Sequence, residues 1–456
     1  MPYTYNTPDD QREMLEAIGA ESLDALFDTI PDEFRLNRPL HLPAALGELE
    51  LTTHLSELAA KNMSPADTLC FLGGGSYDHF IPAVVDYVAS RGEFYTSYTP
   101  YQPEVSQGNL QAMFEYQTMI CQLTGMEVSN QSLYDGGSAA VEAVLMSLTV
   151  TRRSGRVVVA ASVHPEYRQI IDTYFQNLDT DVVVVGCPNG RVDSEELAAA
   201  VTADTACVLL QQPNFFGGLE EVRQLAEITH SAGALFVVAV DPISLGLLQR
   251  PGDYGADIVV AEGQSLGTPM QYGGPYLGIM ACREDFVRRM PGRIAGQTVD
   301  RRGRRCWVLT LQTREQHIRR EKATSNICTN QGLFALRASV YLSVMGPQGM
   351  RQVADLCLQK AAYALGELAQ HERFERAFDI PVFKEFVLRD RHNDVQQLLQ
   401  ASEKVGIFSG VALGQWYPEL TDCLLVTVTE KRTRAEIDRL VEFVTQNSQN
   451  EASVHA

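Results

Sequence analysis

A glycine-broken loop within residues 255–278, GADIVVAEGQSLGTPMQYGGPYLG, has the arrangement in which α/β enzymes place their reactive groups. The apolar run Ile258–Ala261 predicts a strand, and this strand opens into Gly263-Gln264-Ser265 and then Tyr272-Gly273-Gly274-Pro275. Glycine lets the backbone approach a ligand closely, and ligands bind at the carboxyl ends of buried strands. Gln264 carries an amide, which is not basic and cannot form an imine. The loop therefore has the position of a reactive site but lacks an amine.

Lysine is scarce in the whole chain, with six lysines against 31 arginines. The lysines are Lys61, Lys322, Lys360, Lys384, Lys404 and Lys431, and none lies between residues 62 and 321. No catalytic lysine can come from that central segment.

Composition limits the class of protein. The 456 residues are 45% hydrophobic, and the formal net charge of -20 argues against nucleic acid or an anionic membrane as the main partner. No apolar run is long enough to cross a bilayer, and the polar, acidic N-terminus is unlike a signal peptide, so we expect a cytoplasmic protein. Nine cysteines and nine histidines form no recognisable ligand pattern, and we predict no metal site.

Residues 156–282 alternate between short apolar runs and amphipathic segments. Strands are predicted at Val157–Ala161, Val182–Val185, Cys207–Leu210, Leu235–Val240 and Ile258–Ala261, and helices at 165–177, 194–203, 219–232 and 243–249. Strands that are apolar throughout and separated by helices indicate a largely parallel sheet covered on both faces. A further run, Tyr276–Cys282, is expected as the one antiparallel strand.

The remaining segments suggest four regions. We predict a helical arm at residues 1–68 that wraps over a neighbour, a large α/β domain at 69–330, a small α+β domain at 331–446 and a frayed tail at 447–456. The small domain is expected to begin with a long helix, Gln331–Gln370, followed by strands at Pro381–Arg389 and Asp422–Thr429 and helices at Asp394–Lys404 and Arg434–Gln446.

Several polar residues of the predicted sheet region match a pyridoxal-phosphate pocket. Asp241 ends a strand and could bond a pyridine nitrogen, and His164 follows another strand and could stack on the ring. Gly137 and Ser138 open a predicted helix, whose N–H groups and dipole favour a phosphate, although the same sequence serves as an ordinary N-cap. An aspartate closing a strand and a lone histidine are each common for structural reasons alone.

Two surface features leave alternatives open. The aromatic loop around Tyr95, Tyr98 and Tyr101 suits either a small polar ligand and an interface or simple packing on the domain. A dense arginine set within residues 288–320, with Arg301, Arg302, Arg304 and Arg305 at its centre, could pair with the protein's own carboxylates or with a phosphate or acidic partner.

Three long motifs resemble one family. The stretches Tyr98-Thr-Pro-Tyr-Gln-Pro-Glu-Val-Ser-Gln-Gly108, Glu115-Tyr-Gln-Thr-Met-Ile-Cys121 and Arg320-Glu-Lys-Ala-Thr-Ser-Asn-Ile-Cys-Thr329 are similar to the P-protein of the glycine cleavage system. The resemblance covers about residues 60–445, and the chain length resembles the α chain of the two-subunit form. It implies the pyridoxal-phosphate-dependent transferase fold type I, which is aspartate aminotransferase-like, with the active site at a subunit interface.

The resemblance also implies an activity. In the family, glycine is decarboxylated on pyridoxal phosphate, and the aminomethyl group passes to the lipoyl arm of H-protein. Lysine-bearing members carry a His-Lys-Thr-like motif where this chain has Gly263-Gln264-Ser265, so a β subunit is expected to hold the cofactor in an α2β2 heterotetramer. Gly137, Ser138, His164, Asp241 and Gln264 would then form a degenerate cofactor pocket.

The resemblance implies a supporting role for this chain. Candidates to reach the substrate or lipoyl arm lie in two loops: Tyr95, Tyr98, Tyr101, Gln102, Glu104, Thr324, Ser325 and Asn326. The arginine set is a candidate for H-protein docking. Two alternatives remain: a scaffold that takes no part in the chemistry, or a self-sufficient enzyme that uses Lys322 or Lys61.

Overall fold

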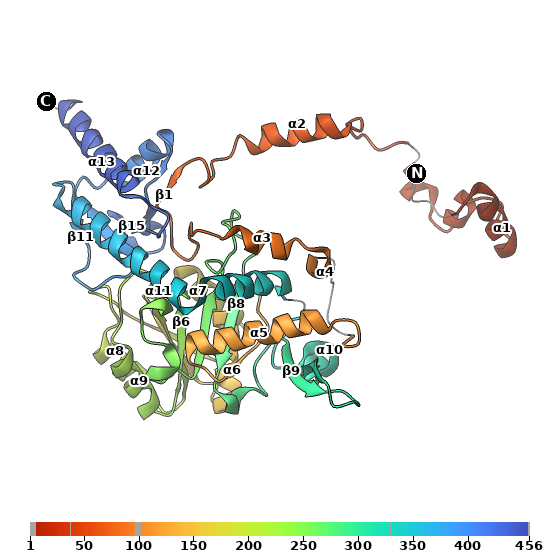
Figure 1. Cartoon of the computed structure of the whole chain (residues 1–456), viewed down its shortest axis with the longest axis horizontal. Helices are drawn as coiled ribbons and strands as arrows, with labels where there is room; N and C mark the ends of the chain where they lie inside the picture. Colours follow the sequence, from red (N-terminus) through yellow and green to blue (C-terminus); the bar gives the residue numbers. More distant parts are fainter. Residues whose placement is uncertain (1–5, 37, 96–101, 329, 455–456) are drawn as a thin grey trace. The chain divides into compact units, whose positions relative to one another are not determined.

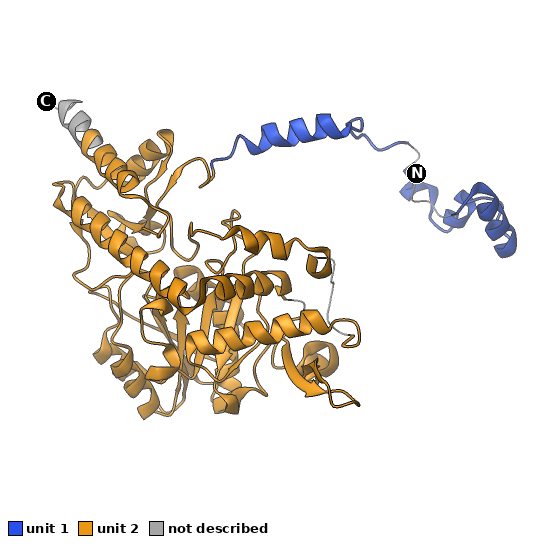
Figure 2. Ribbon diagram, in the orientation of Figure 1, with its two compact units in different colours: residues 1–63 blue, residues 64–456 orange. Residues whose placement is uncertain are grey.

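The computed structural model describes residues 6–36, 38–95, 102–328 and 330–454, with the backbone alone at 447–454. The chain forms two compact units, residues 1–63 and 64–456, which Figure 2 colours separately. The first unit holds α1 (Pro8–Ile18) and α2 (Glu48–Ala59), and none of its described side chains is buried. Our predicted boundaries at 68 and 330 stay predictions.

A seven-stranded sheet forms the centre of the second unit (Figure 1). Its order is β2-β8-β7-β6-β5-β3-β4. The strands are β2 (Val128–Ser129), β3 (Arg156–Ala160), β4 (Asp181–Val185), β5 (Thr205–Gln212), β6 (Leu235–Val240), β7 (Ile258–Glu262) and β8 (Gly278–Cys282). β3 to β7 are parallel, as predicted, and β8 pairs antiparallel with β7. β8 is thus the one antiparallel strand that we expected, because the two-residue β2, too short to leave a sequence pattern, pairs antiparallel with β8 and so runs in the same direction as β3 to β7.

Helices cover this sheet. They include α5 (Gln107–Thr124), α6 (Gly136–Thr151), α7 (Pro165–Phe175), α8 (Ser194–Ala200) and α9 (Val222–Ser231). The predicted helix at 243–249 is wrong, because only a 3-10 turn forms at Ser244–Gly246, a short run that holds a glycine of low helix propensity. The apolar core of this region includes α6 and almost every residue of the central strands.

The segment after β8 contains a hairpin that we did not predict. β9 (Ile294–Val299) pairs antiparallel with β10 (Arg305–Thr310), and the arginine-rich residues 300–304 form the turn between them. Because the turn is charged, the alternation of apolar residues on either side of it is difficult to recognise in the sequence.

The C-terminal part has its own antiparallel sheet, in the order β11-β12-β15-β14. These strands are β11 (Phe374–Arg376), β12 (Glu385–Asp390), β14 (Val411–Ala412) and β15 (Cys423–Thr427), and α12 (Val395–Lys404) and α13 (Arg434–Val454) pack with them around a second apolar cluster. α13 extends beyond the predicted end at Gln446. α11 (Gly332–Gln370) matches the predicted long helix, but it is broken at Gly346, with φ 58° and ψ -179°, directly before Pro347.

The loop before α3 (Ala83–Ala89) joins the two sheets. β1 (Leu69–Cys70) pairs parallel with β13 (Ile407–Phe408), and the chain then passes through Gly73–Gly75 towards the central sheet. A Cβ on Gly73 would lie 1.8 Å from Thr427 Oγ1, so only glycine fits this close approach. No helix in the described part of the chain is long and apolar enough to span a bilayer.

Candidate functional site

Gln264 follows β7 and is fixed by its own amide group. Nε2 donates to the carbonyl oxygens of Tyr77, at 3.0 Å, and Thr268, at 2.7 Å, and Oε1 accepts from the Tyr77 N–H at 2.9 Å. The residue is only 1% exposed, so these three bonds satisfy an otherwise costly buried amide. The nearby hydroxyls of Ser265 and Thr268 are buried and have no hydrogen-bond partner in the described part of the chain. Gln264 therefore ties the loop to the segment before α3.

Asp241, at the end of β6, is paired with a lysine that the sequence had not singled out. Lys384 Nζ lies 2.8 Å from Asp241 Oδ2, and the two side chains are 1% and 10% exposed. The same Nζ lies 3.4 Å from the centroid of the Tyr77 ring and 3.0 Å from His79 Nε2. An ammonium group thus occupies the place opposite Asp241 where we predicted a pyridine nitrogen.

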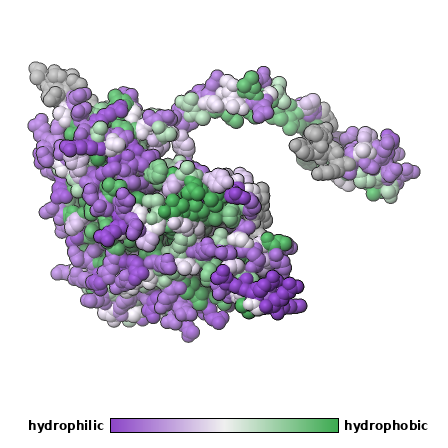
Figure 3. Space-filling model, in the orientation of Figure 1, coloured by the Kyte–Doolittle hydropathy of each residue, from purple (hydrophilic) through white to green (hydrophobic). Residues whose placement is uncertain are grey.

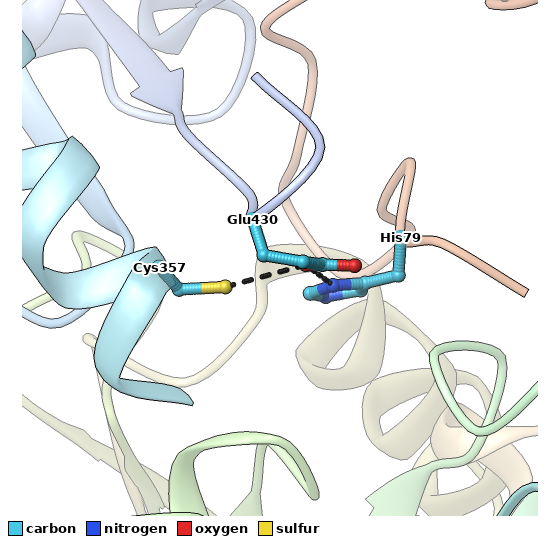
Figure 4. A group of neighbouring side chains, drawn as sticks. All are labelled: His79, Cys357 and Glu430. Carbon is cyan, nitrogen blue, oxygen red and sulfur yellow. Dashed lines mark hydrogen bonds and ion pairs between the residues drawn. The ribbon is translucent and has the colours of Figure 1, made fainter. Parts of the chain in front are cut away.

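His79 extends this buried network to a glutamate and a cysteine (Figure 4). His79 Nδ1 lies 2.6 Å from Glu430 Oε2, and the Cys357 thiol, which α11 carries, donates to the same oxygen at 3.5 Å. Burial alone would raise the pKa of Glu430, but His79 and the Phe80 N–H lower it. Because the Lys384 ammonium is a donor, His79 Nε2 accepts from it and Nδ1–H donates to Glu430.

The three groups of this network could also be considered as metal ligands. The candidate atoms of His79, Cys357 and Glu430 lie within 4.8 Å of one another. The 2.6 Å separation of nitrogen and oxygen is that of a charge-assisted hydrogen bond. The expected absence of a metal site stays a prediction.

The amino end of α6 is occupied by the chain's own carboxyl groups. Asp135 Oδ1 accepts from the Ser138 N–H at 2.7 Å, and Glu262 Oε2 accepts from the Gly136 N–H at 2.9 Å. Glu262 Oε1 accepts from the N–H groups of Gln264 and Leu277 at 2.9 and 3.0 Å. Burial raises the pKa of Glu262 to about 8, and the three N–H donors limit the rise. Carboxyl oxygens thus fill the position that we predicted for a phosphate near Gly137 and Ser138.

His164 is also fully engaged. It caps α7, with Nδ1 accepting from the Glu166 N–H at 3.2 Å, while Nε2 donates to the Gly74 carbonyl at 2.6 Å. Its ring stacks on Tyr167, with 4.7 Å between centroids, and burial lowers its pKa. The Tyr167 hydroxyl also covers Gly136, since it lies 2.1 Å from where a Cβ on that glycine would be.

We call Tyr77, Asp241, Glu262, Gln264 and Lys384 the Gln264 pocket. These residues do not fit pyridoxal phosphate, because a lysine neutralises Asp241, and Glu262 and Asp135 accept the N–H groups of Gly136 and Ser138 at the start of α6. A tyrosine also stacks on the histidine expected to hold the ring. Of the five residues that sequence predicted for a degenerate pocket, His164, Asp241 and Gln264 use their side-chain polar groups within the chain, and Gly137 and Ser138 lie in the first turn of α6.

The predicted interface residues lie in two surface loops. Tyr95 ends α4 (Gly92–Tyr95) and is 69% exposed, and Gln102 and Glu104 are exposed, whereas Tyr98 and Tyr101 fall outside the described residues. In the second loop Asn326 is exposed and Thr324 and Ser325 are half-buried. The Ser325 hydroxyl faces Glu142 of α6, whose pKa burial raises to about 7.

The four central arginines lie in and beside the turn of the β9–β10 hairpin, and all are exposed. Arg304 pairs with Asp300 at 3.2 Å, and Arg305 lies over the Trp307 ring at 5.2 Å. Figure 3 shows a strongly hydrophilic patch at this end of the molecule.

Comparison with known proteins gives one consistent result. The family model of the glycine cleavage system P-protein matches residues 2–444. The chain is 52% identical over 444 residues to a probable glycine dehydrogenase (decarboxylating) subunit 1 of Carboxydothermus hydrogenoformans, covering 97% of this chain and 99% of that protein. A protein of the same description from Thermomicrobium roseum is 49% identical over 443 residues, with 97% and 98% covered.

Solved structures agree with the sequence comparison. A crystal structure of glycine decarboxylase (P-protein) of the glycine cleavage system, in inhibitor-bound form, superposes with a TM-score of 0.91 at 43% identity, covering 98% of this chain and 100% of that one. Glutamate decarboxylase of Lactobacillus brevis shares the fold, with a TM-score of 0.68 at 11% identity over 93% and 97% of the two chains. The chain therefore belongs to the glycine cleavage system P-protein family, has the fold type I architecture of pyridoxal-phosphate-dependent enzymes, and resembles the members described as subunit 1 of glycine dehydrogenase (decarboxylating).

Proposed function

We propose that this chain is the α subunit of a two-subunit glycine dehydrogenase (decarboxylating), active only with a β subunit that carries the Schiff-base lysine. The Gln264 pocket is the observation that carries the proposal, because it has no free amine and its polar groups are used within the chain. In the proposed cytoplasmic α2β2 complex, the β subunit binds pyridoxal phosphate covalently. The complex decarboxylates glycine and passes the aminomethyl group to lipoylated H-protein.

The contribution of this chain is to complete the site of its partner. The loop that begins at Tyr95 and the loop at Thr324–Asn326 are the proposed points of contact with substrate or lipoyl arm. Their exposed polar side chains have the mixed apolar and hydrogen-bonding character of interface residues.

Exposed apolar side chains support a subunit interface. Phe80, Val84 and Tyr87, on and just before α3, are 60%, 39% and 65% exposed, and Figure 3 shows a hydrophobic patch over this helix. Apolar patches of this kind mark association surfaces. Residues 1–63 also expose many leucines and bury none, which fits an arm that requires a neighbour.

Purified alone with pyridoxal phosphate, this chain is expected to show no aldimine absorbance and to form no borohydride-fixed adduct. Glycine–bicarbonate exchange with H-protein is expected only when this chain and the β subunit are mixed, with each alone at least about tenfold less active. The control is the β subunit alone, which should form the adduct. An adduct on this chain, mapped to Lys322 or Lys61, would establish a self-sufficient enzyme instead.

Substitutions in the aromatic loop distinguish a direct role in the chemistry from that of a scaffold. Tyr98→Phe or Tyr101→Phe in the reconstituted complex removes one hydroxyl and leaves the ring. If exchange stayed unchanged for every tyrosine of this loop while the complex still assembled, the chain would be a scaffold.

The β9–β10 turn is proposed to dock H-protein. Reversing the charge in Arg302→Glu/Arg305→Glu should raise the Michaelis constant for H-protein by about tenfold at low salt. The reason is that charges at the rim of an interface mainly control the rate at which the two proteins associate. The difference should shrink as salt rises. Lys404→Glu, a single charge reversal at an exposed residue of α12, is the control for a change of charge elsewhere, and an unchanged Michaelis constant for the arginine variant would refute the docking role.

A further inference from the structure

A second cavity lies beside α5 and the beginning of α11, away from the residues of the Gln264 pocket. Its volume is about 300 Å³, and α4, α5, the first turn of α11 and the segments at Gln131, Arg293 and Asn330 line it. Figure 1 shows α5 and the first part of α11 side by side. We call this space the Gln131 cavity.

Two buried polar side chains line this cavity without using their hydrogen-bonding groups. Gln131 is 0% exposed, and neither its Nε2 nor its Oε1 has a hydrogen-bond partner in the described part of the chain. Tyr116 is 1% exposed, and its hydroxyl is likewise without a partner. A buried polar group without a partner costs about 1–3 kcal/mol, so native structures keep few of them. The contrast with Gln264, whose amide makes three bonds, is direct.

The electrostatic environment of the cavity favours an anion. Arg293 is 3% exposed and lines the cavity, and no lining residue in the described part of the chain is acidic. Arg293 Nε lies 3.9 Å from Glu315 Oε2, and Arg293 Nη1 donates to Asn330 Oδ1 at 3.5 Å. The N-cap of α11, Gln331, makes no side-chain capping bond, and the Gly332 N–H donates to the Asn330 carbonyl at 3.1 Å. Leu333, the next residue of the helix, lines the cavity, where the helix dipole favours negative charge.

The single positive charge and the apolar lining of the Gln131 cavity define the class of anion that it can bind. One guanidinium, beside an amide and a hydroxyl donor, suits a single negative charge better than two. Met113, Leu333 and Leu336 supply apolar wall. A carboxylate that carries a small apolar group matches both the polar and the apolar lining of the cavity.

We propose that the Gln131 cavity binds a small monocarboxylate, with Gln131, Tyr116 and Arg293 holding its oxygens. The proposal goes beyond the proposed function, because all the described lining residues, Tyr95 among them, come from this chain, and binding can be measured without the cofactor or the β subunit.

The test measures the binding of propionate, the probe, to the purified full chain by saturation-transfer NMR and calorimetry. Saturable propionate binding is expected, and propionamide, its neutral isostere, should bind at least about tenfold more weakly because the charge-assisted bonds are lost. Gln131→Leu should weaken propionate binding by about tenfold or more, while the melting temperature without ligand stays equal or rises, since an unpaired buried amide is removed. Gln111→Leu, on the exposed side of α5, is the matched control and should bind normally.

Tyr116→Phe provides a second variant that removes only the hydroxyl, in case Gln131→Leu fails to fold. The proposal is overturned if propionate does not bind saturably, if propionamide binds equally, or if both variants bind as tightly as the unchanged chain. Tighter binding of methyl phosphate than of propionate would overturn the assignment to a carboxylate. Because these measurements need no β subunit, their failure is distinguishable from a failure of exchange activity in the complex.

Discussion

Replacing Lys384 with methionine is expected to lower the free energy of unfolding by about 3–5 kcal/mol. The substitution keeps most of the side-chain volume but leaves the Asp241 carboxylate buried without its cation, 2.8 Å from where the ammonium had been. It also removes the donor to His79 and the cation over the Tyr77 ring. Urea denaturation monitored by circular dichroism measures the loss.

Two further variants distinguish the loss of the Lys384–Asp241 ion pair from a general loss of stability. Lys384→Met/Asp241→Asn removes both charges and is expected to recover part of the loss, because no carboxylate remains unpaired. Lys431→Met breaks an ion pair with Asp78 in which the lysine side chain is 31% exposed, and it should cost no more than about 1 kcal/mol. A cost for Lys384→Met as small as that of Lys431→Met would mean that Asp241 is not held by the lysine.

Stability is expected to fall by about 2 kcal/mol between pH 5 and pH 8 through Glu262 alone. The ordinary pKa of this group is 4.5, and burial raises the folded value to about 8. Between these values the unfolded chain releases the proton while the folded chain keeps it, so the unfolded state binds fewer protons and stability falls as the pH rises. Each unit of difference corresponds to about 1.4 kcal/mol, and the partial exposure of Glu262 reduces the full effect.

Urea denaturation at several pH values, compared between the unchanged chain and Glu262→Gln, isolates this contribution. Glu142, Glu220 and Glu385 also have raised pKa values caused first by burial, so both proteins share their part of the slope. Glu262→Gln should flatten the dependence, whereas the exposed Glu284→Gln should leave it unchanged. Equal slopes for Glu262→Gln and the unchanged chain would contradict the assignment.

Local pattern was enough to predict the central sheet. Runs such as Leu235–Val240 and Ile258–Ala261 are apolar throughout because both of their faces are buried, and this leaves a clear signal. The weaker features were missed for local reasons: β2 has only two residues, and a charged turn interrupts the β9–β10 hairpin.

The content of the Gln264 pocket could not be predicted in the same way. Sequence identified Gln264, Asp241 and His164 because each follows a strand. It could not show that Lys384, 143 positions after Asp241, closes the ion pair, or that the backbone of Tyr77 binds the Gln264 amide. Such contacts depend on how the C-terminal sheet and the Gly73–Gly75 loop meet the central sheet, and residue spacing carries no information on that.

The same reason applies to the Gln131 cavity. Tyr116 lies within a motif that marked the family, but nothing in the sequence joins it to Gln131, Arg293 and the start of α11. The available signal was the family motif itself, which showed that the region mattered without showing what it contacts.

The way in which the Gln264 pocket is filled makes a lysine difficult to introduce there. A single Gln264→Lys change would add a second buried ammonium to the pocket that holds Lys384, while Asp241 stayed neutralised and Glu262 kept the Gly136 N–H of α6. A pocket that could bind a cofactor would need coordinated changes at several positions, each unfavourable without the others. An engineered Schiff-base lysine at position 264 would therefore have to come together with replacement of Lys384 and Glu262.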